Sequence, residues 1–369
     1  MDENDTLSDA SPPAILECWL ASRQDGLAGV SCEYPIFSDA SIAGVWTHPG
    51  CPFTFIGTRR EIPTIRRTPA AVVRMTYYFG RANTDLAPPP YHAGAIQDEL
   101  AALVSLCLGV RAKTTHTYTR TFDEGDPYGQ PICNEEPLRV PEPPLWGREV
   151  APRLLGSRDL AKMPLFHTLP TIRPRDAGVL VAAARLYQEG AWGSNLDPAR
   201  TWLLFVSAVE TAAGYNASVE ASPIERMRAS RPDLERILLQ AGGVALAEKV
   251  ADQIADYMGS TKKFVNFLLK YLPEPLSPRT IDPNLQVSWM HKDLKRAFSR
   301  IYTYRSKTLH GGVAFPAPLC SSPIDIEELP FNMAGSDREH IPMLLHVFGH
   351  IVRGALLNWW RAMLEAPTA

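Results

Sequence analysis

The stretch Tyr302-Thr-Tyr-Arg-Ser-Lys-Thr-Leu-His310-Gly-Gly312 determines how this chain is interpreted. It closes a segment in which apolar residues recur every three or four positions from Leu294 to Tyr304. That spacing predicts a helix over 292–310 that packs against the rest of the protein through one stripe. Gly311 can adopt the left-handed backbone conformation that ends helices, so we expect the helix to stop there.

Arg305 and His310 are the residues of this stretch that suit chemistry on a phosphodiester. Arginine presents a planar fork of donors that matches phosphate oxygens, and histidine exchanges protons near neutral pH. Arg305 continues the apolar stripe, so it needs a partner or an anionic ligand. His310 lies about 140° from Arg305 on an ideal helix, and we expect the last turn to unwind and bring it closer. The alternative is that Arg305 pairs with a carboxylate and His310 only caps the helix.

The predicted helix is strongly basic within a chain whose net charge is only −3. Residues 291–310 contain one acidic residue, Asp293, and six basic ones. The basic residues are Lys292, Lys295, Arg296, Arg300, Arg305 and Lys307. A positive strip on a mildly acidic protein is typical of a surface that binds a polyanion such as RNA. The alternative is a solvated helix face whose charges are answered by acidic neighbours in space.

The spacing of Arg305 and His310 gives R-x4-H, which lies within the R-x4-6-H signature of HEPN domains. The surrounding text from Phe298 to Gly312 resembles the Apea-like HEPN group in particular. The segment 201–210 is similar to the helix that precedes the motif in that group, with Glu210 as the acidic residue that ends an apolar run. The resemblance covers roughly the C-terminal half of the chain, and it implies an all-α, usually dimeric domain.

Many HEPN proteins are metal-independent ribonucleases, and the resemblance implies that activity here. Arg305 would hold the scissile phosphate, and His310 would act as general acid and base while the ribose 2′-oxygen attacks, leaving a 2′,3′-cyclic phosphate end. Because the two residues converge from two protomers in the family, we expect a homodimer with a composite site, RNA as partner, and no cofactor or metal. Glu210 is expected to orient Arg305 or His310, with an ordinary structural ion pair as the alternative. Phage defence is one context that the resemblance allows.

Two positions depart from the family pattern. Ser306, a candidate supporting residue, stands where active members often carry a larger polar side chain, and Gly312 replaces a tyrosine found in the subgroup paired with nucleotidyltransferases. Two other functions therefore stay open. One is a non-catalytic HEPN-like module that dimerises or binds RNA, and the other is a ligand sensor in the N-terminal region that regulates the helical domain.

Length and proline content predict a two-part chain. The 369 residues are 45% hydrophobic and can bury a substantial core, and many of the 33 prolines lie between residues 137 and 174. We expect an irregular mixed α/β domain over 1–134, a Pro-rich linker or surface arm over 135–175, and an all-α HEPN-like helical bundle over 176–369. The fold class as a whole is expected to be α+β.

Local patterns in the first part predict short strands and one helix. Runs rich in β-branched and aromatic residues favour strands at 51–56, 71–79 and 115–122. Apolar residues on one stripe predict a helix at 93–109, which Gly109 is well placed to end.

Residues that typically begin or end helices are easier to recognise in the second part of the chain. Asp197-Pro198 and the capping box Ser222-Pro-Ile-Glu225 predict helix starts, and Gly242-Gly243 predicts a break. Ser260 is expected to cap the helix that follows Gly259. The helices expected here cover 198–213, 232–241, 243–258, 261–272, 292–310 and a final helix that begins at Ser336.

The remaining sequence patterns concern the cellular compartment of the protein and further candidate sites. The acidic N-terminus lacks the pattern of a signal peptide, no run is long enough to span a bilayer, and six scattered cysteines fit free thiols. We therefore expect a cytoplasmic protein without membrane contact. His346 and His350 have the i, i+4 spacing of zinc ligands, but no third ligand is evident, so packed or surface histidines are preferred. The arginine pairs at 59–60 and 66–67 and the acidic stretch 123–126 are interpreted as loop charges and a turn, in preference to RNA contacts and a calcium loop.

Overall fold

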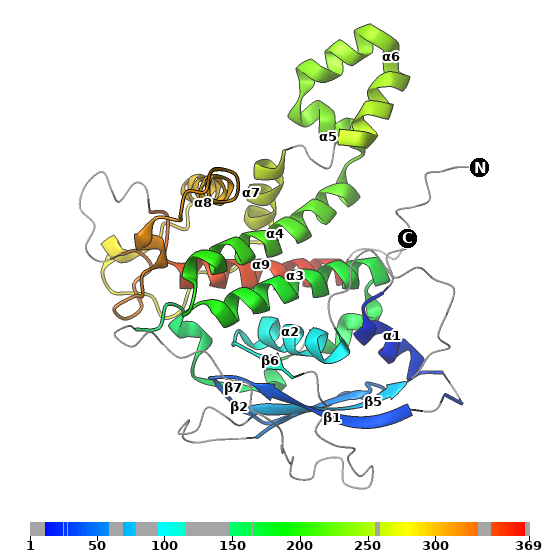
Figure 1. The fold of residues 1–369 in the computed structure, drawn as a ribbon, viewed down its shortest axis with the longest axis vertical. Coiled ribbons are helices and arrows are strands. Elements are labelled where there is room, and N and C mark those ends of the chain that lie inside the picture. The colour runs from blue at the N-terminus through cyan, green and yellow to red at the C-terminus, as the bar shows by residue number, and fades with distance from the viewer. Residues whose placement is uncertain are drawn as a thin grey trace.

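The computed structural model describes residues 12–24, 26–27, 29–58, 69–78, 95–115, 148–163, 165–254, 259–330 and 341–365, without the side chains of 218–220. The predicted strand 115–122 lies almost wholly outside the described residues, as do the arginine pairs at 59–60 and 66–67 and the acidic stretch 123–126. The described protein is mixed α+β. A five-stranded sheet forms one side of the molecule, and layers of helices form the rest (Figure 1).

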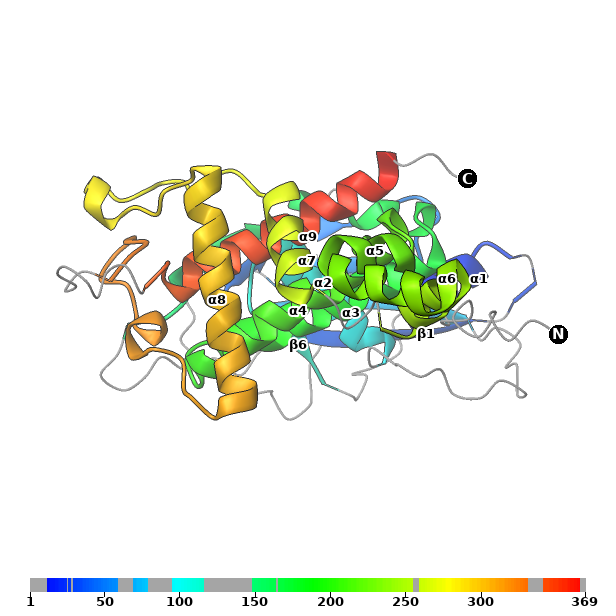
Figure 2. The same ribbon diagram turned by 90° about the horizontal axis from the view of Figure 1, so that it is seen from above.

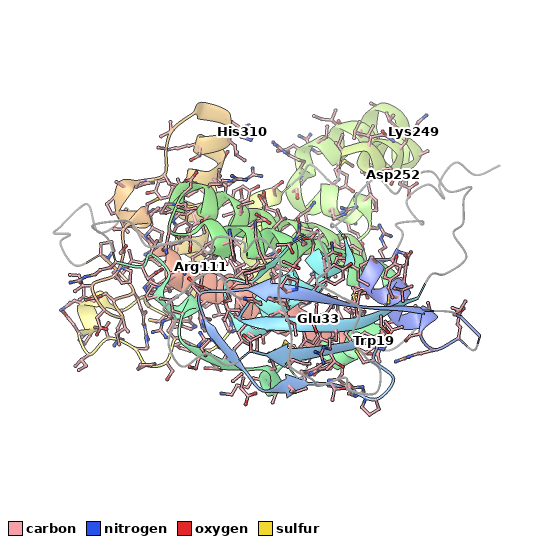
Figure 3. The ribbon with its side chains drawn as sticks, turned by 60° about the horizontal axis from the view of Figure 1, so that its bottom comes forward. Trp19, Glu33, Arg111, Lys249, Asp252 and His310 are labelled. Atoms are coloured by element: carbon pink, nitrogen blue, oxygen red, sulfur yellow. The ribbon has the colours of Figure 1, made fainter. Side chains whose placement is uncertain are left out.

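The five-stranded sheet has the order β3-β4-β5-β1-β6, and its pairs are antiparallel. Its strands are β1 (Gly29–Phe37), β3 (Val45–Trp46), β4 (Phe53–Gly57), β5 (Ala71–Tyr78) and β6 (Lys113–Thr114). β4 and β5 confirm the strands predicted at 51–56 and 71–79, whose β-branched and aromatic residues fit a pleated, half-buried surface. Glu33 of β1 (Figure 3) lies opposite Arg74 of β5, and the buried ion pair between them spans 2.7 Å.

Two helices cover one face of this sheet (Figure 1). They are α1 (Ala14–Ala21) and α2 (Ile96–Leu108). Nearly every residue of α2 is buried, because the sheet lies on one side of it and the next helical layer on the other. Gly109 ends α2 in the left-handed conformation, with φ of 65°, as the sequence predicts.

The described part of the predicted Pro-rich arm, from residue 148 onward, is packed into the molecule. β7 (Ser157–Asp159) pairs in parallel with β2 (Ser41–Ala43) and forms a second, two-stranded sheet. Phe166 is fully buried and packs against Trp19, with ring centroids 5.8 Å apart. The short 3-10 helices in this stretch are η2 (Pro152–Leu154), η3 (Leu160–Lys162) and η4 (Phe166–Thr171). The expectation of a surface arm over 135–175 is therefore wrong for its described residues, because apolar side chains between the prolines enter the core.

A central layer of long helices packs on α2 (Figure 1). It consists of α3 (Pro174–Gly193), α4 (Pro198–Glu220) and α9 (Leu345–Glu365). Most buried apolar residues belong to one continuous hydrophobic cluster, which joins the sheet, α2 and the long helices.

Four further helices lie on the side of this layer away from the sheet. They are α5 (Pro223–Ser230), α6 (Pro232–Ile254), α7 (Ser260–Lys270) and α8 (His291–Gly311). α8 packs on α7 and α4 and crosses the long helices (Figure 2), whereas α5 and α6 project from the body of the molecule (Figure 1). Met227, Ala247 and Ala251 form a separate small cluster between α5 and α6. None of the helices within the described ranges is both long and apolar enough to cross a membrane.

Some helix ends agree with the sequence and others differ. The helix predicted at 198–213 begins as expected, but α4 continues to Glu220. Asp197 accepts a hydrogen bond from the backbone N–H of Arg200, and Ser222 with Glu225 forms the predicted capping box. Gly243, with φ of 71° and ψ of −165°, breaks α6 where the glycine pair predicts a break.

The differences concern the residue that ends or begins each helix. Gly259 and not Ser260 occupies the cap position of α7. The final helix begins at Leu345 and residues 341–344 are not helical, while its predicted start at Ser336 lies outside the described residues. α8 continues through Gly311 and ends at Gly312, which has φ of 63°.

Candidate functional site

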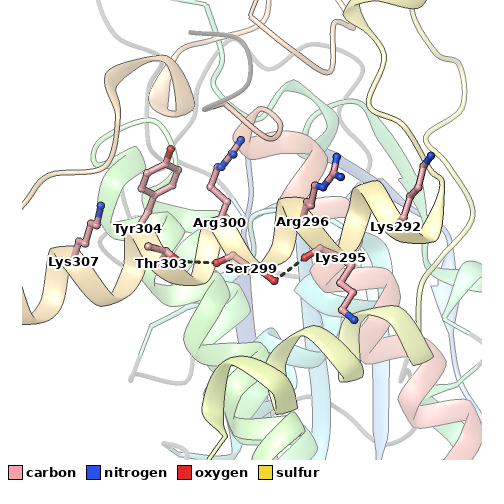
Figure 4. Close-up of a pocket in the computed structure, with 8 residues that line it drawn as sticks. All are labelled: Lys292, Lys295, Arg296, Ser299, Arg300, Thr303, Tyr304 and Lys307. Carbon is pink, nitrogen blue, oxygen red and sulfur yellow. Dashed lines mark hydrogen bonds between the residues drawn. The ribbon is translucent and has the colours of Figure 1, made fainter. Parts of the chain in front are cut away.

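α8 has a buried face and an open face. The buried face packs through Leu294, Phe298, Ile301 and Tyr302, and the Tyr302 ring lies 5.2 Å from the ring of Phe264 on α7. The open face forms a shallow groove of about 640 Å³ (Figure 4). Its lining residues all come from α8, and they are Lys292, Lys295, Arg296, Ser299, Arg300, Thr303, Tyr304 and Lys307. The helical repeat therefore places the apolar side chains that pack on the protein on one face of α8, and the cationic side chains that line the groove on another.

The five predicted RNA-binding residues are brought together in this groove. Four of their side chains are exposed and Arg300 is half-buried. Within the described part of the chain none of the five has an ion pair with a carboxylate. Asp293, the acidic residue of this segment, accepts instead from the hydroxyl of Ser288. The positive charges of the groove thus have no ion-pair partner among the acidic residues that the structure describes.

Arg305 lies on the inner side of α8 and is held by Glu210 of α4. Its Nη2 donates to Oε2 of Glu210 at 2.7 Å, and the hydroxyl of Tyr302 donates to the other carboxylate oxygen at 2.8 Å. The Arg305 guanidinium also stands 5.6 Å from the centre of the Tyr302 ring, in the range of a cation–π contact. Glu210 therefore fixes the orientation of both side chains.

The environment of this trio is partly shielded from solvent. The side chains of Arg305 and Glu210 are 19% and 21% exposed, and Nε of Arg305 is buried without a hydrogen-bond partner. Burial, followed by the bond to the negatively charged Glu210, raises the pKa of Tyr302. Arg305 thus keeps an unused donor, although much of its charge is compensated by the carboxylate.

His310 lies on the other side of α8. The helix does not unwind before it, because the backbone N–H of Gly312 bonds to the carbonyl of Lys307 and completes the last turn. His310 consequently stays about 140° around the helix from Arg305, and the expected swing toward Arg305 is wrong for the single chain. It is exposed at the end of α8 (Figure 3), and an ideal repeat places it on the same side as Lys292, five turns earlier. His310 thus lies about one turn beyond Lys307, the last residue that lines the groove, while Ser306 is half-buried.

His346 and His350 both line a second cavity, which lies between α9 and the C-terminal end of α2. Nε2 of His346 donates to the carbonyl of Glu327 at 2.7 Å, and Nε2 of His350 donates to that of Glu274 at 2.9 Å. Burial lowers the pKa of His346 to about 4. The described ranges contain no group of three or more His, Cys, Asp or Glu side chains that could hold a metal ion.

Three arginines of this second cavity were missed by sequence reasoning. Arg153 comes from η2, Arg158 from β7 and Arg353 from α9. The first two stand in the segment predicted to be a surface arm, so no local pattern connects them to α9. The pair of histidines on α9 was the one signal in the sequence that pointed to this place. Comparison of the chain with protein-family models, with curated proteins and with solved structures finds no match.

Proposed function

We propose that this protein binds single-stranded RNA along the open face of α8 and cleaves it as a metal-independent endoribonuclease. The observation that supports the proposal is the groove itself, whose cationic side chains have no carboxylate partners among the described residues and whose last lining residue, Lys307, stands about one turn before His310. Lys292 and Lys307 are 15 residues apart, which corresponds to about 22 Å of helix. That length accommodates several successive phosphates of an extended strand.

The chemistry follows from the types of residue at the end of the groove. A neutral His310 removes the proton of a ribose 2′-hydroxyl, the 2′-oxygen attacks the adjacent phosphorus, and the bond to the 5′-oxygen breaks. The leaving oxygen takes its proton from a second acid, and the products are a 2′,3′-cyclic phosphate and a free 5′-hydroxyl. Arg305 stabilises the charge that gathers on the phosphate oxygens.

A second protomer is needed to complete such a site. Within one chain Arg305 and His310 lie on different sides of α8, and a single His310 would have to accept and donate a proton in the same step. A homodimer supplies a second His310 as the acid and brings an Arg305 to the phosphate. The resemblance of the R-x4-H segment to HEPN domains supports this arrangement, because their helical bundles build active sites between protomers.

The test is cleavage of end-labelled single-stranded RNA in excess EDTA by the wild type and by His310→Ala. We expect the substitution to lower turnover by about 10²–10⁴-fold while RNA affinity is kept. His291→Ala is the matched control, because His291 is exposed at the opposite end of the same helix. Cleavage that requires a divalent metal, or equal cleavage by His310→Ala, would contradict the mechanism.

A second candidate function is a non-catalytic RNA-binding module. It is favoured by the contact between Arg305 and Glu210, which holds the guanidinium on the inner side of α8. Binding of RNA by the wild type without any cleavage, and with the same affinity in His310→Ala, would support this second function over the first.

A further inference from the structure

The cavity between α9 and the C-terminal end of α2 has an unusual wall. Its volume is about 160 Å³. The polar side chains that line it are Arg153, Arg158, Tyr187, His346, His350 and Arg353. No aspartate or glutamate is among its lining residues. The rest of the wall is apolar and includes Leu154 and Phe205, both buried.

The three arginines direct their hydrogen bonds to neutral carbonyl groups. Arg353 donates to the carbonyls of Leu106 and Cys107, and Arg158 donates to that of Leu108 at 3.0 Å. Arg153 donates to the carbonyls of Ser277 and Pro278 at 3.3 and 2.7 Å. None of the three has a carboxylate partner among the residues that the structure describes.

The two almost fully buried arginines of the described chain, and the half-buried Arg279, are neutralised by carboxylates. Arg74 pairs with Glu33, Arg111 with Asp39 and Glu149, and Arg279 with Glu328. The half-buried arginines of the cavity, by contrast, have backbone carbonyls as partners in place of carboxylates.

The C-terminal end of α2 offsets only part of the charge. A helix end carries the equivalent of about half a negative charge, and it faces two of the three guanidinium groups. Glu328 lies close enough to act on Arg153 and His346, but both of its oxygens accept from Arg279, at 2.7 and 2.6 Å. Burial, and after it the positive charge of Arg353, lowers the pKa of Arg158. The cavity therefore keeps an excess of positive charge.

Two polar atoms of the lining residues lack hydrogen-bond partners. Nε of Arg153 is a buried donor without an acceptor. Nδ1 of His346 is buried without a partner as well, and the side chain of His346 is only 4% exposed. Because Nε2 of His346 donates to a carbonyl, Nδ1 of the neutral ring carries a lone pair and needs a donor. A ligand that suits the cavity must thus be anionic and must also carry one hydrogen-bond donor.

We propose that this cavity binds one inorganic phosphate ion in its hydrogenphosphate form. The arginines compensate the charge of the ion and supply donors to its oxygens, while its remaining P–OH group donates to Nδ1 of His346. The size agrees, since a single water needs about 10–15 Å³ of such volume and drug-sized ligands occupy about 300–1,000 Å³. Sulfate has the same shape and charge but no proton to donate near neutral pH, so it should bind more weakly.

Isothermal titration calorimetry of the full chain with inorganic phosphate tests this site, at about 150 mM NaCl to screen the exposed charges of α8. We expect one phosphate per chain, with sulfate and acetate each bound at least tenfold more weakly. Arg153→Gln should weaken phosphate binding at least tenfold, because it removes one charge and the unused Nε donor. Arg148→Gln is the matched control and should bind like the wild type, since Arg148 also donates to a backbone carbonyl, that of Ile324, but does not line the cavity.

The outcomes separate clearly. No saturable heat up to about 10 mM phosphate, or equal affinity of Arg153→Gln and the wild type, would overturn the site, and sulfate binding as tightly as phosphate would overturn the role of His346. If Arg153→Gln does not fold, as circular dichroism would show, Arg158→Gln replaces it. Arg158 also lines the cavity, so this variant removes one of the positive charges and should likewise weaken phosphate binding.

Discussion

The open face of α8 and the cavity beside α2 are both rich in positive charge, yet they are built in opposite ways. The groove on α8 is made by one helix, its side chains reach into solvent, and their charges have no carboxylate partners in the described chain. The cavity is made by segments far apart in the sequence, and its arginines are tied to backbone carbonyls. The exposed charges of the groove destabilise the fold little and can contact a ligand directly. The arginines of the cavity also connect structural elements through their hydrogen bonds.

The largest effect on stability should come from the imidazole of the cavity. His346 has a pKa of about 4 in the folded protein, mainly because burial disfavours its charged form, against 6.5 in the unfolded chain. Between these values the unfolded state binds the proton and the folded state does not, so stability is complete above pH 6.5 and falls as the pH drops toward 4. The full loss is about 3 kcal/mol.

Urea unfolding in a phosphate-free buffer, at several pH values between about 4 and 7, measures how the free energy of unfolding depends on pH. The charged groups that act on His346 are Arg153, Glu327 and Glu328. His346→Gln keeps a donor for the Glu327 carbonyl and should remove this part of the pH dependence. The comparison of variant with wild type matters, because burial raises the pKa of Glu99 to about 7 and gives a contribution of opposite sign. Parallel pH profiles for the two proteins would contradict the prediction.

A smaller effect is expected at the carbonyls that end α2. Arg353→Gln removes two hydrogen bonds, to the carbonyls of Leu106 and Cys107, together with a positive charge at a helix C-terminus. We expect the free energy of unfolding to fall by about 2 kcal/mol, measured by chemical denaturation without phosphate.

Arg361→Gln is the matched control for that substitution. Arg361 lies two turns further along α9, is exposed, and donates to the side chain of Asn358 in its own helix. Its replacement should change the free energy of unfolding by less than about 0.5 kcal/mol. Equal effects of the two variants would show that the bonds to the end of α2 contribute little to stability.

The contrast between the two regions also explains what could be predicted from sequence. The groove was predictable, because the 3.6-residue repeat of one helix decides which side chains share a face. The strands β4 and β5 and the ends at Gly109, Asp197 and Gly243 were predictable for the same local reason. Glu210 could be connected to Arg305 only through the family resemblance, since the two residues stand on different helices.

What could not be predicted depends on long-range packing or on one backbone angle. Phe166 and Leu160 join the core although prolines surround them, because burial of their apolar side chains outweighs the local preference for an arm. The position of His310 depended on which of two adjacent glycines ends α8. The cavity is lined by Arg153 and Arg353, which are 200 residues apart in the sequence, and no periodic pattern predicts that they lie close together.

The smallest effect on stability is expected on α8, where it is paired with a clear effect on binding. Replacing both Lys295 and Arg296 by glutamine should change the free energy of unfolding by less than about 0.5 kcal/mol, because both side chains are exposed and unpaired among the described residues. The same double substitution should weaken RNA binding and reduce the slope of log affinity against log salt by about 1.4, or about 0.7 for each phosphate of a single strand that is no longer neutralised. Arg231 and Lys249, an exposed arginine and lysine at the end of α5 and on α6 that also have no ion-pair partner among the described residues, form the matched control when both are changed to glutamine. If both double variants lowered the slope equally, RNA would be held by the overall charge of the protein, and the groove on α8 would have no special role. A fall in the salt slope that is confined to the α8 variant would show that RNA is bound by the cationic side chains of α8, which have no ion-pair partner in the described chain.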